Sequence, residues 1–387
     1  MKRIQGKRPN QIPDSILLNP LLAIKKQLLP ANYNFEIEKT LWRIQETQAK
    51  RIGLQFPEGL QMFACILCDI LKSLSEVEDC IVLADIVFGA CCVEDLTASE
   101  LRLDLLIHYG HSCLIPINET CMKTLYVFVD IQINVEDLVK TLIHNFADES
   151  KPVALVSTVQ FVEGVYKAKQ VLVDRGFTHF NIPQAKPRTT GELLGCTSPN
   201  IKERIVVSVS DGRFHLEAAM IQNPTVQAYR YDPYAKQLTS EGYDTERMRG
   251  IRWSSIERAK SCKTFGLILG TLGRQGNLGV FSRIQKNLED AGRTVIPFLM
   301  AEINPLKLQR IVTVDVWVQV ACPRLSIDWS AGFDRPILTP YECEVMIGSA
   351  SWGEVYPMDY YSNAGGAWGN MYHRKPQPKK VEVAIDS

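Results

Sequence analysis

From Arg51 onward, short runs of apolar and β-branched residues alternate with stretches whose apolar residues recur at helical spacing. Runs such as Ile205–Val209 and Val314–Val320 are apolar at nearly every residue, which is typical of strands buried on both faces of a parallel sheet. Parallel strands need crossover connections, and the intervening helical stretches can supply them. The alternation therefore predicts an α/β chain with doubly wound, mostly parallel sheets.

The predicted strands fall into three groups of four. They are Ile52–Phe56, Ile81–Ile86, Leu105–His108 and Leu125–Ile131; Val153–Val159, His179–Ile182, Ile205–Val209 and Val226–Tyr229; and Phe265–Gly270, Thr294–Phe298, Val314–Val320 and Ile337–Leu338. The grouping predicts three similar units packed around a common centre, at 51–148, 149–260 and 261–364. An N-terminal extension at 1–50 and an irregular C-terminal tail at 365–387 are expected to flank them.

Charge and hydropathy argue against several kinds of partner. Lys plus Arg and Asp plus Glu both number 43, so the formal charge is zero and no long-range field attracts nucleic acid or anionic lipid. No apolar run reaches the roughly 18 residues of a membrane helix, and no apolar signal segment follows the basic N-terminus. We therefore expect a cytoplasmic protein that binds neither nucleic acid nor a membrane.

The chain contains eleven cysteines, an odd number, and no secretory signal. This indicates a reducing compartment in which thiols serve packing, metal binding or redox chemistry. Several of them lie near strand ends, where ligands gather in open α/β sheets: Cys91, Cys92, Cys113, Cys196 and Cys322. One interpretation is that each unit offers one cysteine to a shared centre, namely Cys91, Cys196 and Cys322. Their separations are 196 − 91 = 105 and 322 − 196 = 126 residues, about one unit each. Cys91 follows a second predicted strand and Cys322 a third, so either a strand is misplaced or the positions are not equivalent by repeat.

Three convergent thiolates suit an iron–sulfur cluster, because a 4Fe–4S cluster takes four ligands and three cysteines leave one iron open to substrate. Zinc held by three cysteines and water is also chemically possible. Local metal motifs have cysteines about two to four residues apart, unlike these, so buried structural thiols remain a third interpretation. Cys92 is the second candidate for the first position.

Other cysteines and histidines are weaker candidates. The Cys65-x-x-Cys68 pair lies in the middle of a predicted helix, whereas reactive pairs of this kind begin a helix, so we expect it to pack in the core. Cys80 is predicted to be structural, with no partner in view. His108 and His111 flank Tyr109-Gly110, and a zinc or general-base role there is conceivable.

Two glycine-containing loops follow predicted strands and precede predicted helices. One contains Gly212 and His215, and the other contains Gly270 and Gln275. Glycine lets a backbone approach a ligand closely, and a helix N-terminus favours a carboxylate or phosphate. The second loop is not a P-loop, because no Gly-Lys-Ser/Thr follows it. An ordinary turn before a helix explains each loop equally well.

In combination, these loops resemble the diphthamide synthesis radical enzymes, and among them the catalytic subunit. The resemblance extends from about Arg51 to Met358. It rests on Phe88-Gly89-Ala90-Cys91-Cys92-Val93-Glu94-Asp95, His108-Tyr109-Gly110-His111-Ser112-Cys113, Leu194-Gly195-Cys196, Asp211-Gly212-Arg213-Phe214-His215, Gly270-Thr271-Leu272-Gly273-Arg274-Gln275-Gly276-Asn277 and Tyr356-Pro357-Met358-Asp359.

The resemblance implies transfer of the 3-amino-3-carboxypropyl group of S-adenosylmethionine to a histidine of elongation factor 2, the first step of diphthamide biosynthesis. It implies a 4Fe–4S cluster held by Cys91, Cys196 and Cys322, which cleaves a carbon–sulfur bond of S-adenosylmethionine by a non-standard radical route. The loops with Gly212, His215, Gly270 and Gln275 are then expected to bind S-adenosylmethionine. A homologous second subunit, forming a heterodimer, and an electron-donor protein are also implied.

Two other functions remain open from the sequence. The chain could be a non-catalytic structural subunit of the same heterodimer. It could also be a doubly wound enzyme that uses an intact nucleotide and no metal, in which case the purified protein should be colourless and tolerant of oxygen.

Overall fold

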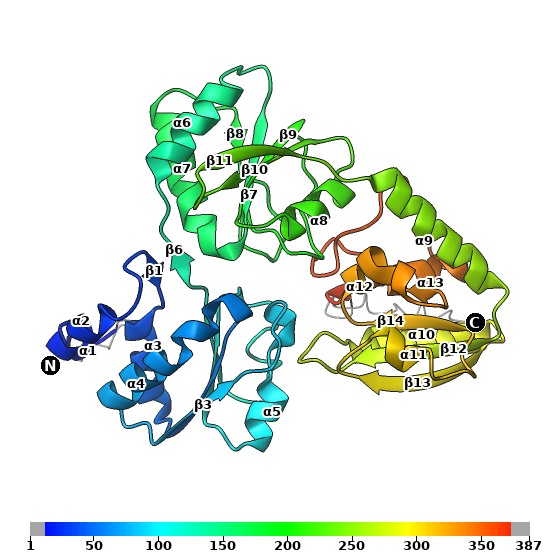
Figure 1. The fold of residues 1–387 in the computed structure, drawn as a ribbon, viewed down its shortest axis with the longest axis horizontal. Coiled ribbons are helices and arrows are strands. Elements are labelled where there is room, and N and C mark those ends of the chain that lie inside the picture. The colour runs from blue at the N-terminus through cyan, green and yellow to red at the C-terminus, as the bar shows by residue number, and fades with distance from the viewer. Residues whose placement is uncertain (1–11, 373–387) are drawn as a thin grey trace, which may run out of the picture.

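The computed structural model describes residues 12–372. Three mostly parallel sheets occupy the corners of a triangle in Figure 1, with helices on their faces. A short antiparallel ribbon, β1 (Tyr33–Asn34) with β6 (Asp130–Ile131), lies between the first and second sheets. The predicted architecture, three α/β units around a common centre, is confirmed.

The three sheets share one strand order. The first contains β2 (Arg51–Gln55), β3 (Asp79–Leu83), β4 (Leu105–Tyr109) and β5 (Thr124–Val127), in the order β3-β2-β4-β5. The second contains β7 (Val153–Ser157), β8 (Phe180–Asn181), β9 (Ile205–Val209) and β10 (Gln227–Asp232), in the order β8-β7-β9-β10, with β11 (Gln237–Glu241) added antiparallel. The third contains β12 (Thr264–Gly270), β13 (Thr294–Met300), β14 (Val316–Val320) and β15 (Ile337–Leu338), in the order β13-β12-β14-β15. Each unit therefore repeats one topology, in which its second strand lies at an edge beside its first.

Crossover helices cover these sheets. They are α4 (Ala64–Leu74) and α5 (Asp95–Glu100) in the first unit, α7 (Val162–Asp174) and α8 (Phe214–Gln222) in the second, and α10 (Leu278–Asp290), α11 (Pro305–Leu308) and α12 (Pro323–Trp329) in the third. A further helix, α13 (Pro340–Met346), follows the last strand of the third sheet. Side chains cap several of them: Asn277 accepts from the Val280 amide at the start of α10, and Thr339 forms a capping box with Glu342 at the start of α13.

A helix also precedes the first strand of every unit and packs on that unit. These helices are α3 (Ile37–Thr47), α6 (Val135–Phe146) and α9 (Thr245–Lys260), which belong to the cores of the first, second and third sheets respectively. The prediction began each unit at its first strand, and so assigned residues 135–146 to the first unit and 245–260 to the second. In the structure the repeated unit begins one helix earlier, because the apolar face of that helix is buried against the sheet that follows it.

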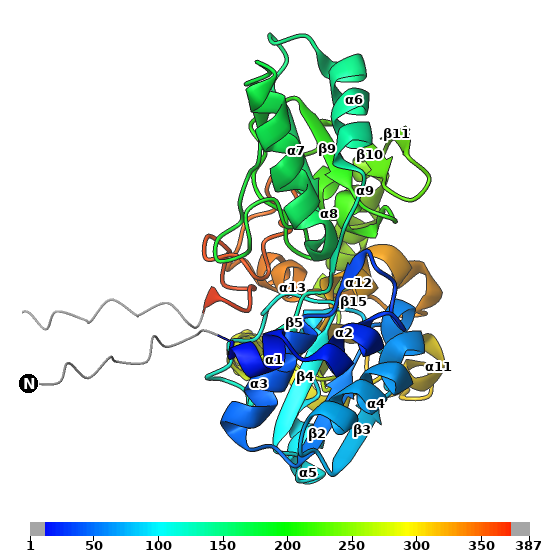
Figure 2. The same cartoon turned by 90° about the vertical axis from the view of Figure 1, so that its left-hand side faces the viewer.

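The N-terminal segment is part of the first unit's core. Helices α1 (Asp14–Leu17) and α2 (Pro20–Lys26) lie against α3 and α4 (Figure 2). Leu22, Leu29 and Phe35 are buried in the same apolar cluster as β2 and α4. The predicted extension at 1–50 is therefore continuous with the first unit wherever the structure describes it.

Some elements differ from the predictions. The run predicted as one strand at Leu125–Ile131 is divided into β5 and β6, because Val129 adopts a left-handed conformation with φ 56°. The predicted helix that contains Cys65 and Cys68 is α4, and a 3₁₀ turn at Glu58–Phe63 precedes it. The elements that were not predicted are helices α1, α2, α5, α9, α12 and α13 and strands β1 and β11. Within residues 12–372, no helix is both long and apolar enough to cross a membrane.

We predict that Arg252→Ala lowers the free energy of unfolding by about 3–5 kcal/mol, because it leaves a buried carboxylate uncompensated. Arg252 on α9 and Glu342 on α13 are both fully buried and form a bidentate ion pair at 2.7 and 2.6 Å. Chemical denaturation measures the change. Arg258→Ala is the matched control, because Arg258 is exposed on the same helix and should shift stability by no more than about 0.5 kcal/mol. Equal effects of the two substitutions would contradict the prediction.

Candidate metal centre

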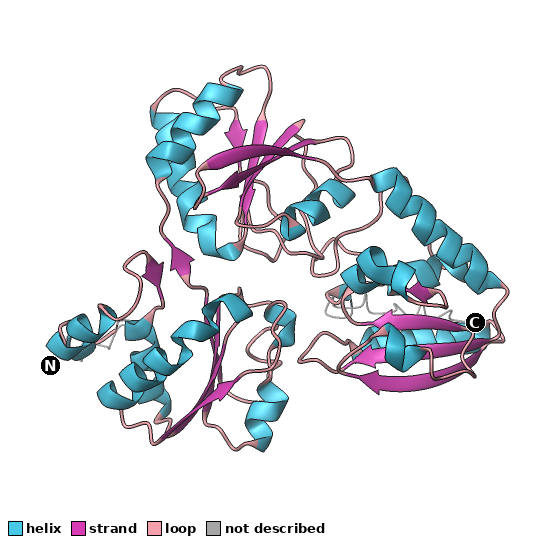
Figure 3. Ribbon diagram, in the orientation of Figure 1, coloured by secondary structure: helices cyan, strands magenta, loops and turns pink. Residues whose placement is uncertain are grey.

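Loops from all three units face the middle of the triangle in Figure 3. Cys91, Cys196 and Cys322 meet there. The Cys91 thiol interacts electrostatically with those of Cys322 and Cys196, and buried Tyr361 interacts with all three. Cys91 and Cys196 also pack on one apolar cluster. The structure thus brings together the three cysteines that the sequence singled out.

Cys91 lies in a single 3₁₀ turn, Ala90–Cys92, where the Cys92 amide donates to the Gly89 carbonyl at 2.9 Å. The Cys92 side chain is fully buried, and its sulfur accepts a hydrogen bond from Gln275 Nε2 at 3.3 Å. Cys91 is partly exposed and has the centre's other thiols as neighbours. Because the Cys92 sulfur is buried and already accepts a hydrogen bond, this arrangement favours Cys91 over Cys92 as the cysteine available to bind a metal group.

The loop after β12 in the third unit holds the Cys91 turn in place. The Arg274 amide donates to the Cys91 carbonyl at 2.7 Å, and the Arg274 side chain forms a bidentate ion pair with buried Asp95 at 2.8 and 2.6 Å. Gly273 has φ 52°, and a Cβ on it would lie 2.4 Å from the Cys92 carbonyl carbon. Only glycine permits this approach between the two units.

Cys196 lies at the tip of a tight turn. Leu194 and Thr197 exchange backbone hydrogen bonds of 3.0 and 3.3 Å, which leaves Gly195 and Cys196 between them. A Cβ on Gly195 would lie 2.1 Å from the Phe214 ring, so the turn packs directly on the start of α8.

Cys322 is the N-cap residue of α12, and Arg324 ties this helix to the second unit. The guanidinium of Arg324 is nearly fully buried and donates to the carbonyls of Gly195 and Phe214 at 3.3 and 2.9 Å. It also pairs with Glu217 at 2.5 Å and lies 4.1 Å from the Phe214 ring centroid. One side chain therefore connects the Cys322 loop to the Cys196 turn.

The chain after α13 returns to the centre and covers it. Residues 358–361 lie along the Cys196 turn: the Ser198 amide donates to the Met358 carbonyl at 2.9 Å and the Tyr361 amide donates to Thr197 Oγ1 at 2.9 Å. Further on, Trp368 Nε1 donates to Asp359 at 2.8 Å, and Met371 is buried in the cluster that contacts Cys91. The part of the predicted tail that the structure describes, 365–372, is irregular in secondary structure but packed.

Burial and the closeness of the three thiols to one another disfavour their deprotonation to thiolates. The neighbouring Cys92 thiol, burial and the other cysteines hold the pKa of Cys91 well above its usual range. Burial, followed by Cys322, raises the pKa of Cys196 to about 12, and burial raises the pKa of Cys322. A bound cation reverses this preference and deprotonates thiols outright. As a donor set, three partly buried thiols that repel one another as thiolates fit a multiply charged metal group.

Among residues 12–372, no three Cys, His, Asp or Glu side chains are grouped closely enough to hold one metal ion. A cluster differs from a single ion in this respect, because each of its thiolates binds a different iron atom.

The four residues expected to bind S-adenosylmethionine have different surroundings. A Cβ on Gly270 would lie 2.5 Å from Ala321 Cβ, and Gln275 donates to Cys92, so both support the cysteine loops directly. His215 lies near Arg324 and His111, and burial lowers its pKa to about 4. Gly212 is exposed, with open space where a Cβ would be.

His108 and His111 form a buried polar chain beside the centre. His108 Nδ1 lies 2.8 Å from Gln55 Oε1, and its Nε2 lies 3.0 Å from His111 Nδ1. Burial lowers the pKa of both, to about 4 for His111, so both are neutral at pH 7. Gln55 in turn donates to the Cys92 carbonyl at 2.9 Å, so the chain positions the Cys91 turn.

The three cysteines are not equivalent by repeat. Cys91 and Cys196 follow the second strands of their units, β3 and β8, whereas Cys322 follows a third strand, β14. The repeat equivalent of Cys322 in the first unit is the loop with Cys113, whose thiol donates to the Ile115 carbonyl instead. The strand assignment was correct, and the positions of the cysteines within their units differ.

Two residues near the centre were not predicted. Tyr361 lies just beyond the Tyr356–Asp359 motif. Arg188 is buried and interacts with Cys113 and Cys196, and its Nε has no hydrogen-bond partner among the described residues. No local pattern distinguishes Arg188. Its position shortly before Gly195-Cys196 in the chain is the one signal that could have indicated it.

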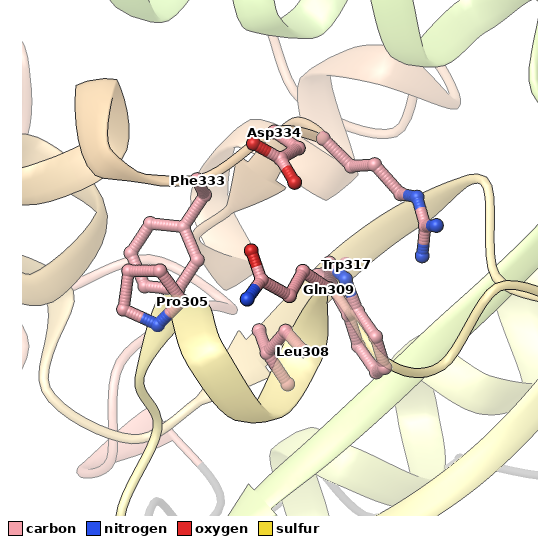
Figure 4. Close-up of a pocket in the computed structure, with 7 residues that line it drawn as sticks. Pro305, Leu308, Gln309, Trp317, Phe333 and Asp334 are labelled. Carbon is pink, nitrogen blue, oxygen red and sulfur yellow. The ribbon is translucent and has the colours of Figure 1, made fainter.

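Neither of two pockets in the described part of the chain touches the cysteines. One lies in the third unit and is lined by Pro305, Leu308, Gln309, Trp317, Phe333, Asp334 and Arg335 (Figure 4), with a volume of about 10 Å³, enough for one water. The other, about 700 Å³ and open, lies beside the N-terminal segment.

Comparison with known proteins identifies relatives over nearly the whole chain. A family model described as "Putative diphthamide synthesis protein" matches residues 56–357. The chain is 49% identical over 380 residues to 2-(3-amino-3-carboxypropyl)histidine synthase subunit 1 of Mus musculus, covering 97% of this chain and 86% of the relative. It is 47% identical over 392 residues to the protein of that name from Schizosaccharomyces pombe, covering 99% and 89%.

A solved structure shares the fold. Dph2 from Pyrococcus horikoshii with a 4Fe–4S cluster superposes with a TM-score of 0.71 at 27% identity, covering 85% of this chain and 94% of that one.

We predict that Asp95→Asn lowers the free energy of unfolding by about 1–3 kcal/mol at pH 7, the usual cost of losing hydrogen bonds to a buried charge. Burial alone would raise the pKa of Asp95, but hydrogen bonds from Arg274 and the Cys121 amide lower it below its usual range. The stabilisation is therefore complete above the unfolded pKa of about 3.9 and is lost as the pH falls through the lower folded value.

Urea titrations at a series of pH values test this dependence. The difference in unfolding free energy between the wild type and Asp95→Asn should shrink as the pH falls below about 4. Asp95 of the wild type is then protonated first in the unfolded state and, at lower pH, in the folded state as well. Asp290→Asn, at an exposed carboxylate on α10, is the control and should have little effect at any pH. A difference that stays constant down to pH 2 would refute the assignment.

Proposed function

The chain belongs to the diphthamide synthesis family, and we propose that it transfers the 3-amino-3-carboxypropyl group of S-adenosylmethionine to a histidine of elongation factor 2. The observation that carries the proposal is the meeting of three cysteines from three units in one buried centre. Relatives that match most of the chain are named as subunit 1 of the corresponding histidine synthase.

Cys91, Cys196 and Cys322 would hold a 4Fe–4S cluster, leaving one iron without a protein ligand. Two features support this set. The three thiols destabilise one another as free thiolates, and the structural relative contains such a cluster. When bound, the cluster supplies the single electron that cleaves S-adenosylmethionine on its aminocarboxypropyl side.

The chain's own residues position and protect this chemistry. Arg274 and Arg324 fix the cysteine loops against one another, and Tyr361 and Met371 exclude water from one side of the centre. Arg188, buried beside Cys196, carries a positive charge that can offset negative charge on the thiolates. His215 and Gly212, at the start of α8, would contact the polar groups of S-adenosylmethionine.

The name of the relatives, subunit 1, indicates a multi-subunit enzyme. We propose a heterodimer with a homologous second subunit in the cytoplasm, where elongation factor 2 acts, and an electron-donor protein that reduces the cluster. The alternative, a non-catalytic subunit of the same heterodimer, makes a different prediction for the cysteine variants.

We predict that Cys91→Ser, Cys196→Ser and Cys322→Ser each remove the cluster and lower transferase activity by at least about 10-fold, since even outer-shell partners of metal ligands cost 10–100-fold. The anaerobically purified wild type should contain about four irons per chain and absorb near 400 nm, with bleaching on reduction. Iron, sulfide and transfer of labelled aminocarboxypropyl group to elongation factor 2, with the second subunit present, are measured together.

Two control variants sharpen this experiment. Cys65→Ser removes an exposed thiol of the first unit, and Cys92→Ser removes the neighbour of Cys91; both should keep iron and activity. If the three centre variants lose iron but keep full activity, the chain is the non-catalytic subunit. If they keep both, the cysteines are structural and the proposed centre is wrong.

A further inference from the structure

A second thiol pair lies in the first unit, away from the centre. Cys68 on α4 and Cys80 on β3 have their sulfur atoms 2.8 Å apart. Cys80 is near the start of β3, whereas the Cys91 turn follows the other end of that strand. The sequence had assigned Cys80 no partner, because α4 and β3 become neighbours only when the crossover closes.

We propose that Cys68 and Cys80 are a modification site that forms a reversible intramolecular disulfide by exchange with a low-molecular-weight disulfide. A disulfide bond is about 2.05 Å long, so the sulfur atoms need to approach by only about 0.8 Å (2.8 − 2.05). Both side chains are partly exposed, which gives a small reagent access.

The exchange needs no reactant other than the two protein thiols and the small disulfide. Cys68 loses its proton and attacks the small disulfide, which releases one thiolate and leaves a mixed disulfide on Cys68. Cys80 then loses its proton and attacks the Cys68 sulfur, which releases the second thiolate. The two released thiolates take up the two protons. The protein dithiol is oxidised by two electrons, and the small disulfide is reduced to two thiols.

The groups around Cys68 and Cys80 indicate which thiol attacks the small disulfide and which resolves the mixed disulfide. The Cys80 thiol donates to the Cys68 sulfur, and this hydrogen bond is the main cause that lowers the pKa of Cys68; Lys72, one turn further along α4, adds to the effect and Asp69 opposes it. The same hydrogen bond and burial raise the pKa of Cys80. Cys68 is therefore the attacking thiol and Cys80 the resolving one, since the thiolate is the nucleophile.

The bond would connect the helix α4 to an edge strand. Within residues 12–372, β3 pairs only with β2, so no described strand pairs with its outer side. The closed loop would span residues 68–80, and a cross-link of this kind restricts the unfolded chain. The oxidised protein should therefore melt at a higher temperature than the reduced protein.

Anaerobic equilibration of the full-length protein with glutathione buffers tests the proposal without exposing the centre to oxygen. Buffers range from fully reduced to glutathione disulfide alone; free thiols are then alkylated and the unreduced digest is analysed by mass spectrometry. We expect a Cys68–Cys80 cross-linked peptide that has lost two hydrogen atoms, disappears with dithiothreitol and accompanies a rise in melting temperature. Cys80→Ser should instead accumulate glutathione on Cys68, because the resolving thiol is missing.

Cys65→Ser is the matched control, since Cys65 is exposed one turn before Cys68 on the same helix. This variant should form the Cys68–Cys80 bond as the wild type does. The proposal fails if Cys68 and Cys80 remain alkylatable in glutathione disulfide alone, or if Cys65 is the main partner of either. Iron content measured in the same samples is expected to stay unchanged, so this test is independent of the proposed transferase function.

Discussion

Three partly buried thiols that disfavour one another's charge can share a centre only if other contacts hold their loops together. The third unit supplies those contacts on both sides. Arg274 joins it to the first unit through Asp95, and Arg324 joins it to the second through Glu217 and two carbonyls. Arg274 directly follows Gly273, which packs closely on Cys92, and Arg324 lies shortly after Cys322 in the chain. The contacts that assemble the centre therefore lie at the interfaces between units.

The repeated sheets could be predicted because the signal is local. Continuous apolar runs such as those at β9 and β14 allow few structures other than strands buried on both faces, and their order requires parallel crossovers. The positions of Cys91, Cys196 and Cys322 near strand ends were predictable for the same reason. Helix α9 was missed because its buried face includes Arg252 and Ser255, polar residues that interrupt the apolar periodicity.

The contacts that complete the site could not be predicted, because they join residues far apart in the chain. Asp95 and Arg274 are 179 positions apart, and no local pattern marks either as the partner of the other. The loop with Gly270 and Gln275 has the composition of a ligand loop, but much of that composition serves close packing against Cys92 and Ala321. A glycine that makes room for a ligand and a glycine that makes room for another backbone segment cannot be distinguished in a sequence.

The unequal placement of the cysteines has a consequence for symmetry. Three copies of one unit arranged around an axis would offer three equivalent thiols, and every approach to the centre would look alike. Here two thiols follow second strands and one follows a third strand. The centre therefore lacks threefold symmetry and has one distinct side. Within one polypeptide the three units differ in sequence, and this difference gives the centre a direction.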